Sequence, residues 1–159
     1  MFGLFKKKST ELVAPISGKV VDLSQVPDEV FSQKMAGDGV AIEPSDDLVV
    51  APADGTINLI FKTNHAFAMT LDNGLELLIH IGIDTVELDG EGFERLGEEG
   101  AKVKAGTPIV KINRKFFEEK GYSTITPVLV TNSDTLKEMN CMIGKTVTAG
   151  KDVVIAYTK

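Results

Sequence analysis

The hydrophobic positions of this chain fall in short runs rich in valine and isoleucine, and glycine, proline, asparagine or aspartate closes most of them. Such runs are typical of many short strands joined by tight turns. The pattern predicts strands over residues 13–23, 39–43, 48–51, 55–63, 66–71, 75–81, 102–103, 108–112, 126–131, 146–148 and 152–156. Helical periodicity is brief, and it predicts short helices at residues 93–99, 113–121 and 133–140.

Two internal repeats organise these strands. The pattern V-A-P-x-x-G-x-[VI] occurs at residues 13–20 and again at residues 50–57. A glycine-bounded stretch at residues 100–106 is echoed at residues 144–150, and aliphatic residues follow each copy. Two copies fall short of the roughly three or more units that a solenoid needs. We therefore expect an all-β fold, namely an antiparallel β-sandwich with internally duplicated hairpin motifs and a few short helical turns.

The length of 159 residues suits one domain, which would bury about 70% of its unfolded surface. We expect a flexible N-terminal segment over residues 1–10 and a single β-sandwich domain over residues 11–159. Residues 1–8 combine large apolar side chains with the lysine run Lys6-Lys7-Lys8. That composition supports at most peripheral membrane contact through residues 1–8.

Charge and cysteine content narrow the class of function. The net charge of -6 argues against a nucleic-acid binder, which needs a basic surface. A single cysteine, Cys141, rules out a disulfide framework and a cysteine-rich zinc module. The apolar runs are far shorter than the roughly 18 residues of a membrane span, and no secretory leader pattern precedes the lysines. These features predict a soluble, cytoplasmic protein with protein or small-molecule partners.

The chain contains two histidines, His65 and His80, on the apolar runs that flank residues 72–74. The sequence there is Asp-Asn-Gly, and Asn-Gly is the strongest signal for a two-residue hairpin turn. Such a turn places both histidines on one face, as diagonal or direct cross-strand neighbours according to which pair of residues turns. A bulged, three-residue loop would separate them. We expect the two-residue turn and converging imidazoles.

The same alternation assigns the two faces of this hairpin. The core face is expected to carry Leu75, Leu77, Ile79, Ile81 and Ile83, with Ala66, Ala68 and Thr70 opposite. The other face is expected to carry His65, Phe67, Met69 and Leu71 against Leu78, His80, Gly82 and Asp84. A histidine pair among apolar side chains is expected to be an outward docking surface, whereas a small-substrate enzyme would favour a deep pocket.

Few chemistries suit two histidines with so little else. Cys141 lies in a different segment with no visible base, which argues against nucleophilic catalysis by its thiol. A catalytic zinc needs about three protein ligands, and His65, His80 and Asp84 would form an unusual set. Two imidazoles suit phosphoryl transfer, because one nitrogen attacks phosphorus while the neighbouring ring donates to its oxygens.

The residues around the histidines match a known family. The strings T-N-H-A-F at residues 63–67 and L-L-I-H-I-G-I-D-T-V at residues 77–86 resemble the enzyme IIA component, glucose type, of the bacterial phosphoenolpyruvate-dependent sugar phosphotransferase system. Further matching strings lie at residues 14–18, 26–28, 37–42, 90–93 and 126–128. The resemblance covers nearly the whole chain from about residue 11 and implies a single IIA-type antiparallel sandwich domain.

This resemblance implies a phosphohistidine relay. His80 is implied to accept a phosphoryl group on Nε2 from the histidine-containing phosphocarrier protein and to pass it to a cysteine of a sugar permease's IIB domain. His65 is implied to stabilise the phosphate and Thr63 to orient His65, while Asp28 and Asp84 flank the site. No cofactor is required, although His65 and His80 could hold zinc that a partner shares. Regulated metabolic enzymes or transporters are further expected partners.

Two of these roles have a physical basis in the sequence. A backbone carbonyl near Gly82 is expected to hold Nδ1–H of His80, because a glycine lets the chain approach closely. Thr63 has the parity of His65, so its hydroxyl is expected to reach that ring. The partner-binding surface is expected to consist of Phe67, Met69 and Leu78 on the hairpin, and the resemblance implies that Val30, Phe31, Phe61 and Val86 complete it. Relatives often carry other residue types at Glu29, Leu78 and Ile81, which bears on partner affinity.

Two rival classes share part of the pattern. Biotinyl- or lipoyl-type carrier domains also use A-P-x-x-G-x-V elements on short strands, but they need an exposed lysine in a Met-Lys-Met or Asp-Lys-Ala setting, and neither tripeptide occurs. A zinc peptidase with a related duplicated β architecture is the other alternative. The metal content of the purified protein would distinguish it from the phosphoryl relay.

Overall fold

The structure is a computed structural model that describes residues 9–159. Residues 1–8 of the predicted N-terminal segment therefore lie outside the described residues. The predicted boundary at residue 10 falls inside strand β1, which begins at Ser9. No helix described within residues 9–159 has the length and apolar character needed to cross a bilayer.

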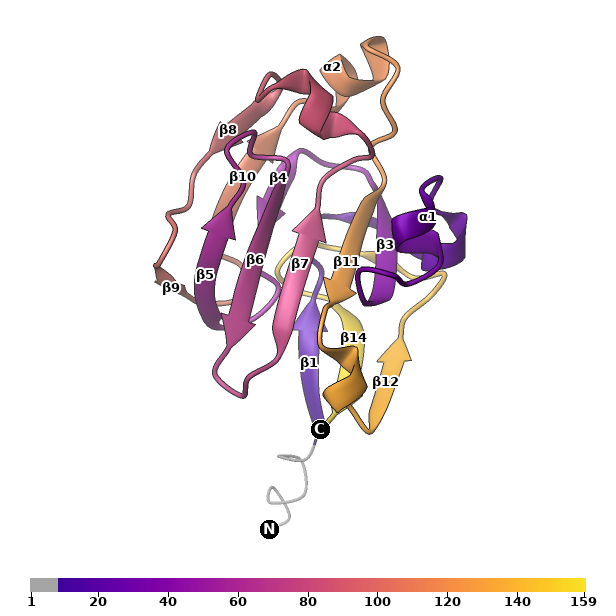
Figure 1. Cartoon of the computed structure of the whole chain (residues 1–159), viewed down its shortest axis with the longest axis vertical. Coiled ribbons are helices and arrows are strands. Elements are labelled where there is room, and N and C mark those ends of the chain that lie inside the picture. Colours follow the sequence, from indigo (N-terminus) through magenta and orange to yellow (C-terminus); the bar gives the residue numbers. More distant parts are fainter. Residues whose placement is uncertain (1–8) are drawn as a thin grey trace.

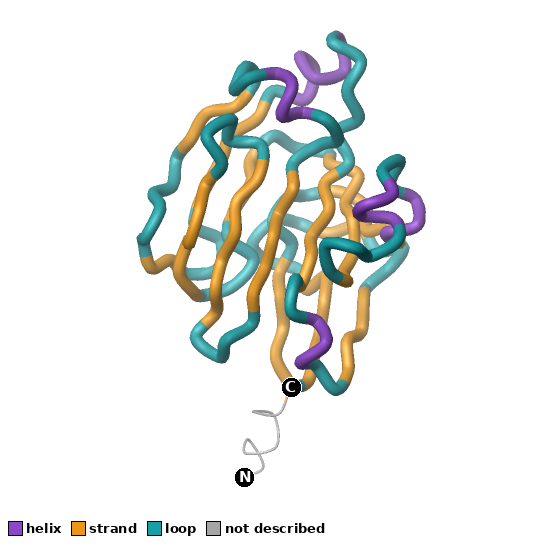
Figure 2. The backbone as a smooth tube through the Cα atoms, viewed as in Figure 1, coloured by secondary structure: helices purple, strands orange, loops and turns teal. Residues whose placement is uncertain are grey.

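Strands account for most of the regular secondary structure in the described chain (Figures 1 and 2). In chain order they are β1 (Ser9–Val13), β2 (Gly18–Asp22), β3 (Asp38–Pro44), β4 (Leu48–Val50), β5 (Gly55–Ile60), β6 (Ala66–Leu71), β7 (Glu76–His80), β8 (Phe93–Arg95), β9 (Lys102–Val103), β10 (Pro108–Ile112), β11 (Thr126–Val130), β12 (Glu138–Cys141), β13 (Thr146–Val147) and β14 (Val153–Thr158). The helical turns are η2 (Leu23–Gln25), α1 (Glu29–Ser32), η3 (Thr85–Leu88), α2 (Arg114–Glu119) and η4 (Ser133–Thr135).

Within residues 9–159 these strands form one 8-stranded sheet, of order β13-β2-β3-β11-β7-β6-β5-β9, and two 3-stranded sheets, β1-β14-β12 and β4-β10-β8. Every strand pair in the described residues is antiparallel, as for β6 with β7 and β11 with β3. One hydrophobic core joins side chains from the large sheet with side chains from β1, β10 and β14. The structure thus confirms the predicted antiparallel β-sandwich with a few short helices.

The two copies of the V-A-P pattern lie side by side in the structure. Val13 N–H donates to the carbonyl of Pro52 at 2.8 Å, and Val50 N–H donates to the carbonyl of Pro15 at 2.7 Å. Each copy of the V-A-P pattern therefore supplies a donor and an acceptor to the other copy. This reciprocal exchange joins the two copies, and the prolines can take part because a proline carbonyl accepts although its nitrogen cannot donate.

A second, smaller core lies on the outer face of the large sheet. Side chains alternate along β3 and β11, so that Val40 faces the main core while its neighbour Ala41 faces the outer one. The segment that contains α1 covers this outer face. The outer core comprises Val21, Leu23, Val26, Phe31, Ala41, Ile83, Ile125 and Leu129, with Ala36 and Leu78 packed against it.

The turn between the histidine-bearing runs differs from the prediction. Leu71 N–H donates to the carbonyl of Leu75 at 2.9 Å, so residues 72–74 form a three-residue loop. Asn73 stabilises this loop because its Oδ1 accepts from Leu75 N–H at 3.1 Å and its Nδ2 donates to Tyr157 Oη at 2.9 Å. Gly74 takes a φ of 90°, which supplies the left-handed residue such loops require.

The extra loop residue shifts the pairing by one and reverses the face of β6. His80 pairs with Ala66 and Ile79 pairs with Phe67. The predicted outward position of Phe67, Met69 and Leu71 is therefore wrong. These side chains lie in the main core with Leu75, Leu77, Ile79 and Ile81, whereas Ala66, Ala68 and Thr70 share the face of Leu78 and His80.

Three other local predictions need correction. Residues 93–99 do not form a helix, because β8 pairs along β10 with Arg95 opposite Val110. Residues 133–140 form only the short turn η4 before strand β12 begins. The run at residues 13–23 divides at Pro15 into β1 and β2. The helix predicted at residues 113–121 is present as α2, and Asn113 caps it by accepting from Phe116 N–H at 3.0 Å.

Candidate functional site

His80 ends strand β7 on the outer face of the large sheet, beside α1. Its ring centroid lies 4.7 Å from that of Phe31, and the side chain is half-buried. Its Nδ1 lies 2.8 Å from the carbonyl oxygen of Gly82. A carbonyl can only accept, so Nδ1 carries the proton and Nε2 keeps a lone pair. The neutral ring is thereby set as a nucleophile through Nε2.

Packing around Gly82 fixes the position of this carbonyl. The residue has a φ of 76°, and a Cβ there would lie 2.6 Å from Thr85 Cγ2 and 2.9 Å from the carbonyl oxygen of Ser123. The neighbouring Ile83 N–H donates to that same Ser123 carbonyl at 3.1 Å. Sequence reasoning did not single out Ser123, because a contact through a main-chain carbonyl leaves no mark on residue type.

His65 lies immediately before β6, and the two imidazoles meet there. Their centroids are 5.1 Å apart with the rings nearly perpendicular at 80°. The prediction that a three-residue loop would separate the histidines is wrong. His65 follows Asn64, whose φ of 60° is left-handed, so regular strand alternation does not direct its side chain. The His65 residue is only 6% exposed, with its ring set against the more accessible His80.

Thr63 and Phe61 surround the His65 ring. Thr63 Oγ1 lies 2.5 Å from His65 Nδ1, and the Phe61 ring meets the imidazole edge-on at 5.2 Å. When the hydroxyl donates to Nδ1, the neutral ring carries its proton on Nε2. This tautomer offers an N–H donor beside the nucleophilic nitrogen of His80.

Two carboxylates lie near His80. Asp28 is the N-cap of α1, where its Oδ1 accepts from Val30 N–H at 2.9 Å. Asp84 is exposed and has a left-handed φ of 61° at the start of η3. The negative charges of Asp28 and Asp84 both act to raise the pKa of His80. An Asp ahead of a short helical turn is itself a capping signal, and it could have located α1 from the sequence.

Burial keeps both imidazoles neutral. The pKa of His65 is lowered from 6.5 to about 4, mainly by desolvation and to a smaller extent by the neighbouring His80. Desolvation also lowers the pKa of His80, against the opposing effects of the Gly82 hydrogen bond and of the two carboxylates. At neutral pH each ring therefore has one N–H and one lone pair, which gives the site a nucleophile and an adjacent donor.

The free energy of unfolding should fall as the pH is lowered through the range in which the folded protein keeps these histidines neutral. Between pH about 6.5 and about 4 the unfolded chain binds a proton at His65 that the folded chain does not, so the free energy of unfolding falls as pH falls. We expect His65 to account for about 2 kcal/mol of loss between pH about 7.5 and about 5. Urea unfolding of the wild type and of His65→Gln at both pH values measures it. Equal losses in the two proteins would contradict the assignment.

The surface around the histidines is only partly the predicted one. Val30 and Val86 are 45% and 50% exposed, and Phe61 and Leu78 are partly exposed. Phe31 is 7% exposed and packs on the ring of His80.

The assignment of Phe67 and Met69 to this surface is wrong. They are 0% and 1% exposed in the main core. The three-residue loop is the cause, because it turns their face of β6 inward. Partner binding therefore has less aromatic surface available than the sequence suggested.

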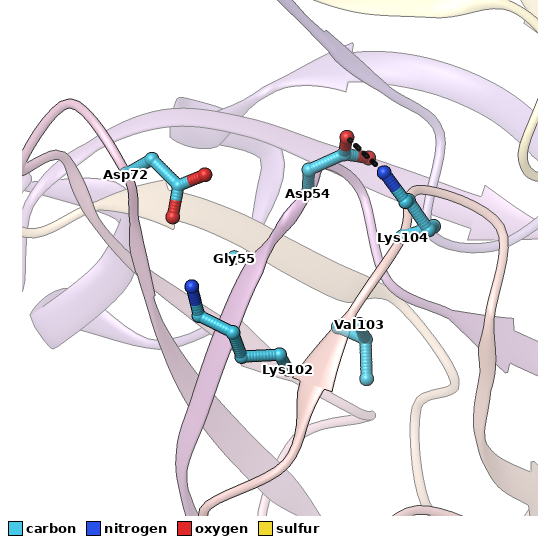
Figure 3. Close-up of a pocket in the computed structure, with 6 residues that line it drawn as sticks. All are labelled: Asp54, Gly55, Asp72, Lys102, Val103 and Lys104. Carbon is cyan, nitrogen blue, oxygen red and sulfur yellow. Dashed lines mark ion pairs between the residues drawn. The ribbon is translucent and has the colours of Figure 1, made fainter.

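The described residues do not bring together a metal site. Within residues 9–159 no three histidine, cysteine, aspartate or glutamate side chains are grouped as ligands. A separate surface hollow occurs at Gly55, which pairs with Leu71 at the end of β6 remote from His65. There Lys104 Nζ lies 3.7 Å from Asp54 Oδ2, while Lys102 and Asp72 line the same hollow (Figure 3). It contains no histidine.

An antiparallel sandwich with two adjoining neutral imidazoles, one of which has its Nδ1 held by a carbonyl, has the groups that a histidine-based phosphoryl carrier uses. The family described as phosphoenolpyruvate-dependent sugar phosphotransferase system, EIIA 1, matches residues 10–136. The chain belongs to this family, as the sequence resemblance indicated. It is accordingly a phosphotransferase-system component that transfers phosphoryl groups in sugar uptake.

Individual relatives agree with this assignment. The chain is 46% identical over 163 residues to the glucose-specific EIIA component of Haemophilus influenzae, with 100% of this chain and 96% of that protein covered. It is 49% identical over 145 residues to the N-acetylglucosamine-specific EIICBA component of Klebsiella pneumoniae, with 91% of this chain but 22% of that protein covered. The solved glucose permease IIA from Mycoplasma capricolum has a TM-score of 0.86 at 37% identity, and the coverage is 94% of this chain and 96% of that one.

Proposed function

We propose that His80 is the residue that carries the phosphoryl group, on Nε2, and that His65 stabilises it there. The observation that supports this most is that Nδ1 of His80 lies 2.8 Å from the Gly82 carbonyl oxygen, while the centroids of the His65 and His80 rings lie 5.1 Å apart. One nitrogen of His80 is therefore committed to the main chain. The other is free to react beside a donor.

In the accepting step, the Nε2 lone pair of His80 attacks phosphorus on the phosphohistidine of the phosphocarrier protein. A new P–N bond forms as the donor's P–N bond breaks, and the donor imidazole leaves with the electron pair. His65 donates from Nε2–H to a phosphoryl oxygen, and Thr63 holds that ring through Nδ1. In the delivering step, a cysteine thiolate of the permease IIB domain displaces His80 in the same way.

Asp28 and Asp84 keep the phosphoryl group transferable. Their negative charges stabilise a protonated His80 but repel a phosphoryl group on the same ring. Repulsion raises the free energy of the phosphorylated state relative to the free protein. Delivery to the next acceptor is therefore favoured over storage.

The proposed partners are the histidine-containing phosphocarrier as donor and a permease IIB domain as acceptor, with regulated enzymes or transporters as further partners. The EIICBA architecture of the Klebsiella relative supports the IIB assignment, because it joins these components in one chain. The exposed Val30 and Val86 offer apolar contact beside His80. The proposed location is the cytoplasm, with residues 1–8 making at most peripheral membrane contact.

Phosphorus and nitrogen NMR tests this assignment. The 15N-histidine-labelled protein is incubated with phosphoenolpyruvate, enzyme I and the phosphocarrier, and the bonded nitrogen is identified from its coupling to phosphorus. We expect one phosphoryl group, bonded to Nε2 of His80. A phosphoryl group on His65, or on Nδ1 of His80, would overturn the proposal.

Zinc shared with a partner stays a secondary proposal. His65 and His80 would provide two imidazole nitrogens of the roughly four ligands that a tetrahedral ion takes, so the partner would have to provide the others. Zinc that strengthens binding of a partner to the wild type, but not to His65→Gln, would support it. Binding that is equal with and without zinc would contradict it.

A further inference from the structure

The chain segment that leads into His65 runs along an unfinished sheet edge. Strand β9 pairs with β5 only at Gly55 and Thr56, and the register of β5 shifts between Ile57 and Leu59. Beyond that bulge no neighbouring strand is described for the outer edge of β5. The side chains of Arg95, the last residue of β8, and of Glu99, which follows β8, bond to that edge instead.

Arg95 provides most of these contacts. Its Nε donates to Asn64 Oδ1 at 2.8 Å, and its Nη2 donates to the carbonyls of Phe61 at 3.0 Å and Ile60 at 3.3 Å. Glu99 completes the edge, since its Oε2 accepts from Ile60 N–H at 2.9 Å. Arg95 lies on β8, which Figure 1 shows beside the upper end of β5, so its guanidinium ties the small β4-β10-β8 sheet to the large one.

The anchored residues belong to the turn that brings Thr63 and His65 together. Asn64 N–H donates to the carbonyl of Phe61 at 2.7 Å, which closes a turn over residues 61–64. Asn64 holds the left-handed φ of 60° within that turn. Thr63 and His65 flank Asn64, so this backbone conformation sets whether Thr63 Oγ1 reaches His65 Nδ1.

We propose that Arg95 is a positioning residue for phosphoryl transfer, which acts by holding the 61–64 turn so that Thr63 orients His65. This inference rests on the proposed role of His65. The planar guanidinium suits the task because it can bind two carbonyls and an amide oxygen at once, which a lysine ammonium on a flexible stem does less well. The sequence pattern gave no sign of this role, because residues 93–99 were expected to be helical rather than to pair as a strand.

The side chain of Arg95 is exposed, so its contacts add little to global stability. Its removal should instead loosen one turn. In Arg95→Ala we expect delivery of the phosphoryl group from His80 to the IIB domain to slow about tenfold, which corresponds to about 1.4 kcal/mol. The pKa of His65, read from its ring NMR signals, should rise from about 4 toward 6.5 as the ring gains access to water.

Arg114→Ala is the matched control. Arg114 makes a comparable set of bonds, from Nε to Asp47 Oδ1 at 2.7 Å and from Nη1 to the carbonyl of Pro44 at 3.2 Å, but these partners do not adjoin His65. We expect wild-type delivery and an unchanged His65 pKa. The same tenfold loss in Arg114→Ala would show general loosening and overturn the inference.

The double variant Arg95→Ala/His65→Gln tests the path of action. If Arg95 acts through His65, the double variant should deliver at the rate of His65→Gln alone. A further tenfold loss, or a wild-type rate and His65 pKa in Arg95→Ala, would overturn the inference. Failure of the proposed function is a different result, since it appears as normal phosphoryl acceptance by His80→Ala or normal delivery by His65→Gln.

Discussion

His80→Ala is expected to abolish phosphoryl acceptance. The substitution removes the nitrogen that bonds phosphorus, and no other side chain at the site offers a neutral nucleophile with the same access. His65 is only 6% exposed and its Nδ1 is occupied by Thr63. We expect incorporation of phosphate from phosphoenolpyruvate, through enzyme I and the phosphocarrier, to fall by more than about 10⁴-fold.

His65→Gln is the control for this result. It should still accept a phosphoryl group on His80, but delivery to the IIB domain should slow by about 10²–10³-fold, the usual loss when one charge-stabilising donor is removed. Urea unfolding at neutral pH should show that both variants are folded. Normal labelling of His80→Ala would contradict the assignment, because the phosphoryl group would then have another acceptor.

Gly82→Ala is expected to damage stability and chemistry together. Alanine would have to keep a left-handed φ of 76°, with its Cβ 2.6 Å from Thr85 Cγ2 and 2.9 Å from the Ser123 carbonyl. The strained backbone and the overpacking should together cost about 2–5 kcal/mol in the free energy of unfolding. Relief of the clash should move the carbonyl that holds His80 Nδ1, and a misplaced nucleophile slows transfer by about 10²-fold.

Gly90→Ala separates the effect of backbone strain from that of overpacking. Gly90 also has a left-handed φ, of 92°, but a Cβ there would meet nothing within 4 Å. We expect a loss of only about 1–2 kcal/mol, from the backbone term alone, and wild-type transfer. Urea unfolding and the phosphoryl-acceptance assay compare the two variants directly. A Gly82→Ala protein as stable and active as Gly90→Ala would show that this close packing does not fix the carbonyl.

The sequence was sufficient for the features that repeat along the chain. Short aliphatic runs with glycine and proline between them predicted an antiparallel sandwich. The duplicated V-A-P pattern predicted duplicated hairpin motifs, and the structure adds that the reciprocal bonds of Val13 and Val50 join its two copies. The strings around His65 and His80 led to the correct family, whose model matches residues 10–136.

The predicted two-residue turn of the hairpin is wrong because of the contacts that the Asn73 side chain makes. Asn-Gly favours a two-residue turn, but Asn73 uses its side chain on Leu75 and on the distant Tyr157, and the three-residue loop results. Tyr157 is in the last strand, so the sequence around residue 73 does not indicate this contact. One extra residue was enough to move Phe67 and Met69 from the expected docking surface into the core.

The chain's own sequence thus determined the kind of sandwich, the family and the pair of histidines, since these follow from local residue type and spacing. Only the tertiary structure decided which β6 residues face outward and how Arg95 holds the turn before His65. The physical reason is that both depend on contacts between segments distant in sequence, and two of the Arg95 contacts go to a backbone carbonyl. Such an atom is present in every residue and therefore leaves no pattern to read.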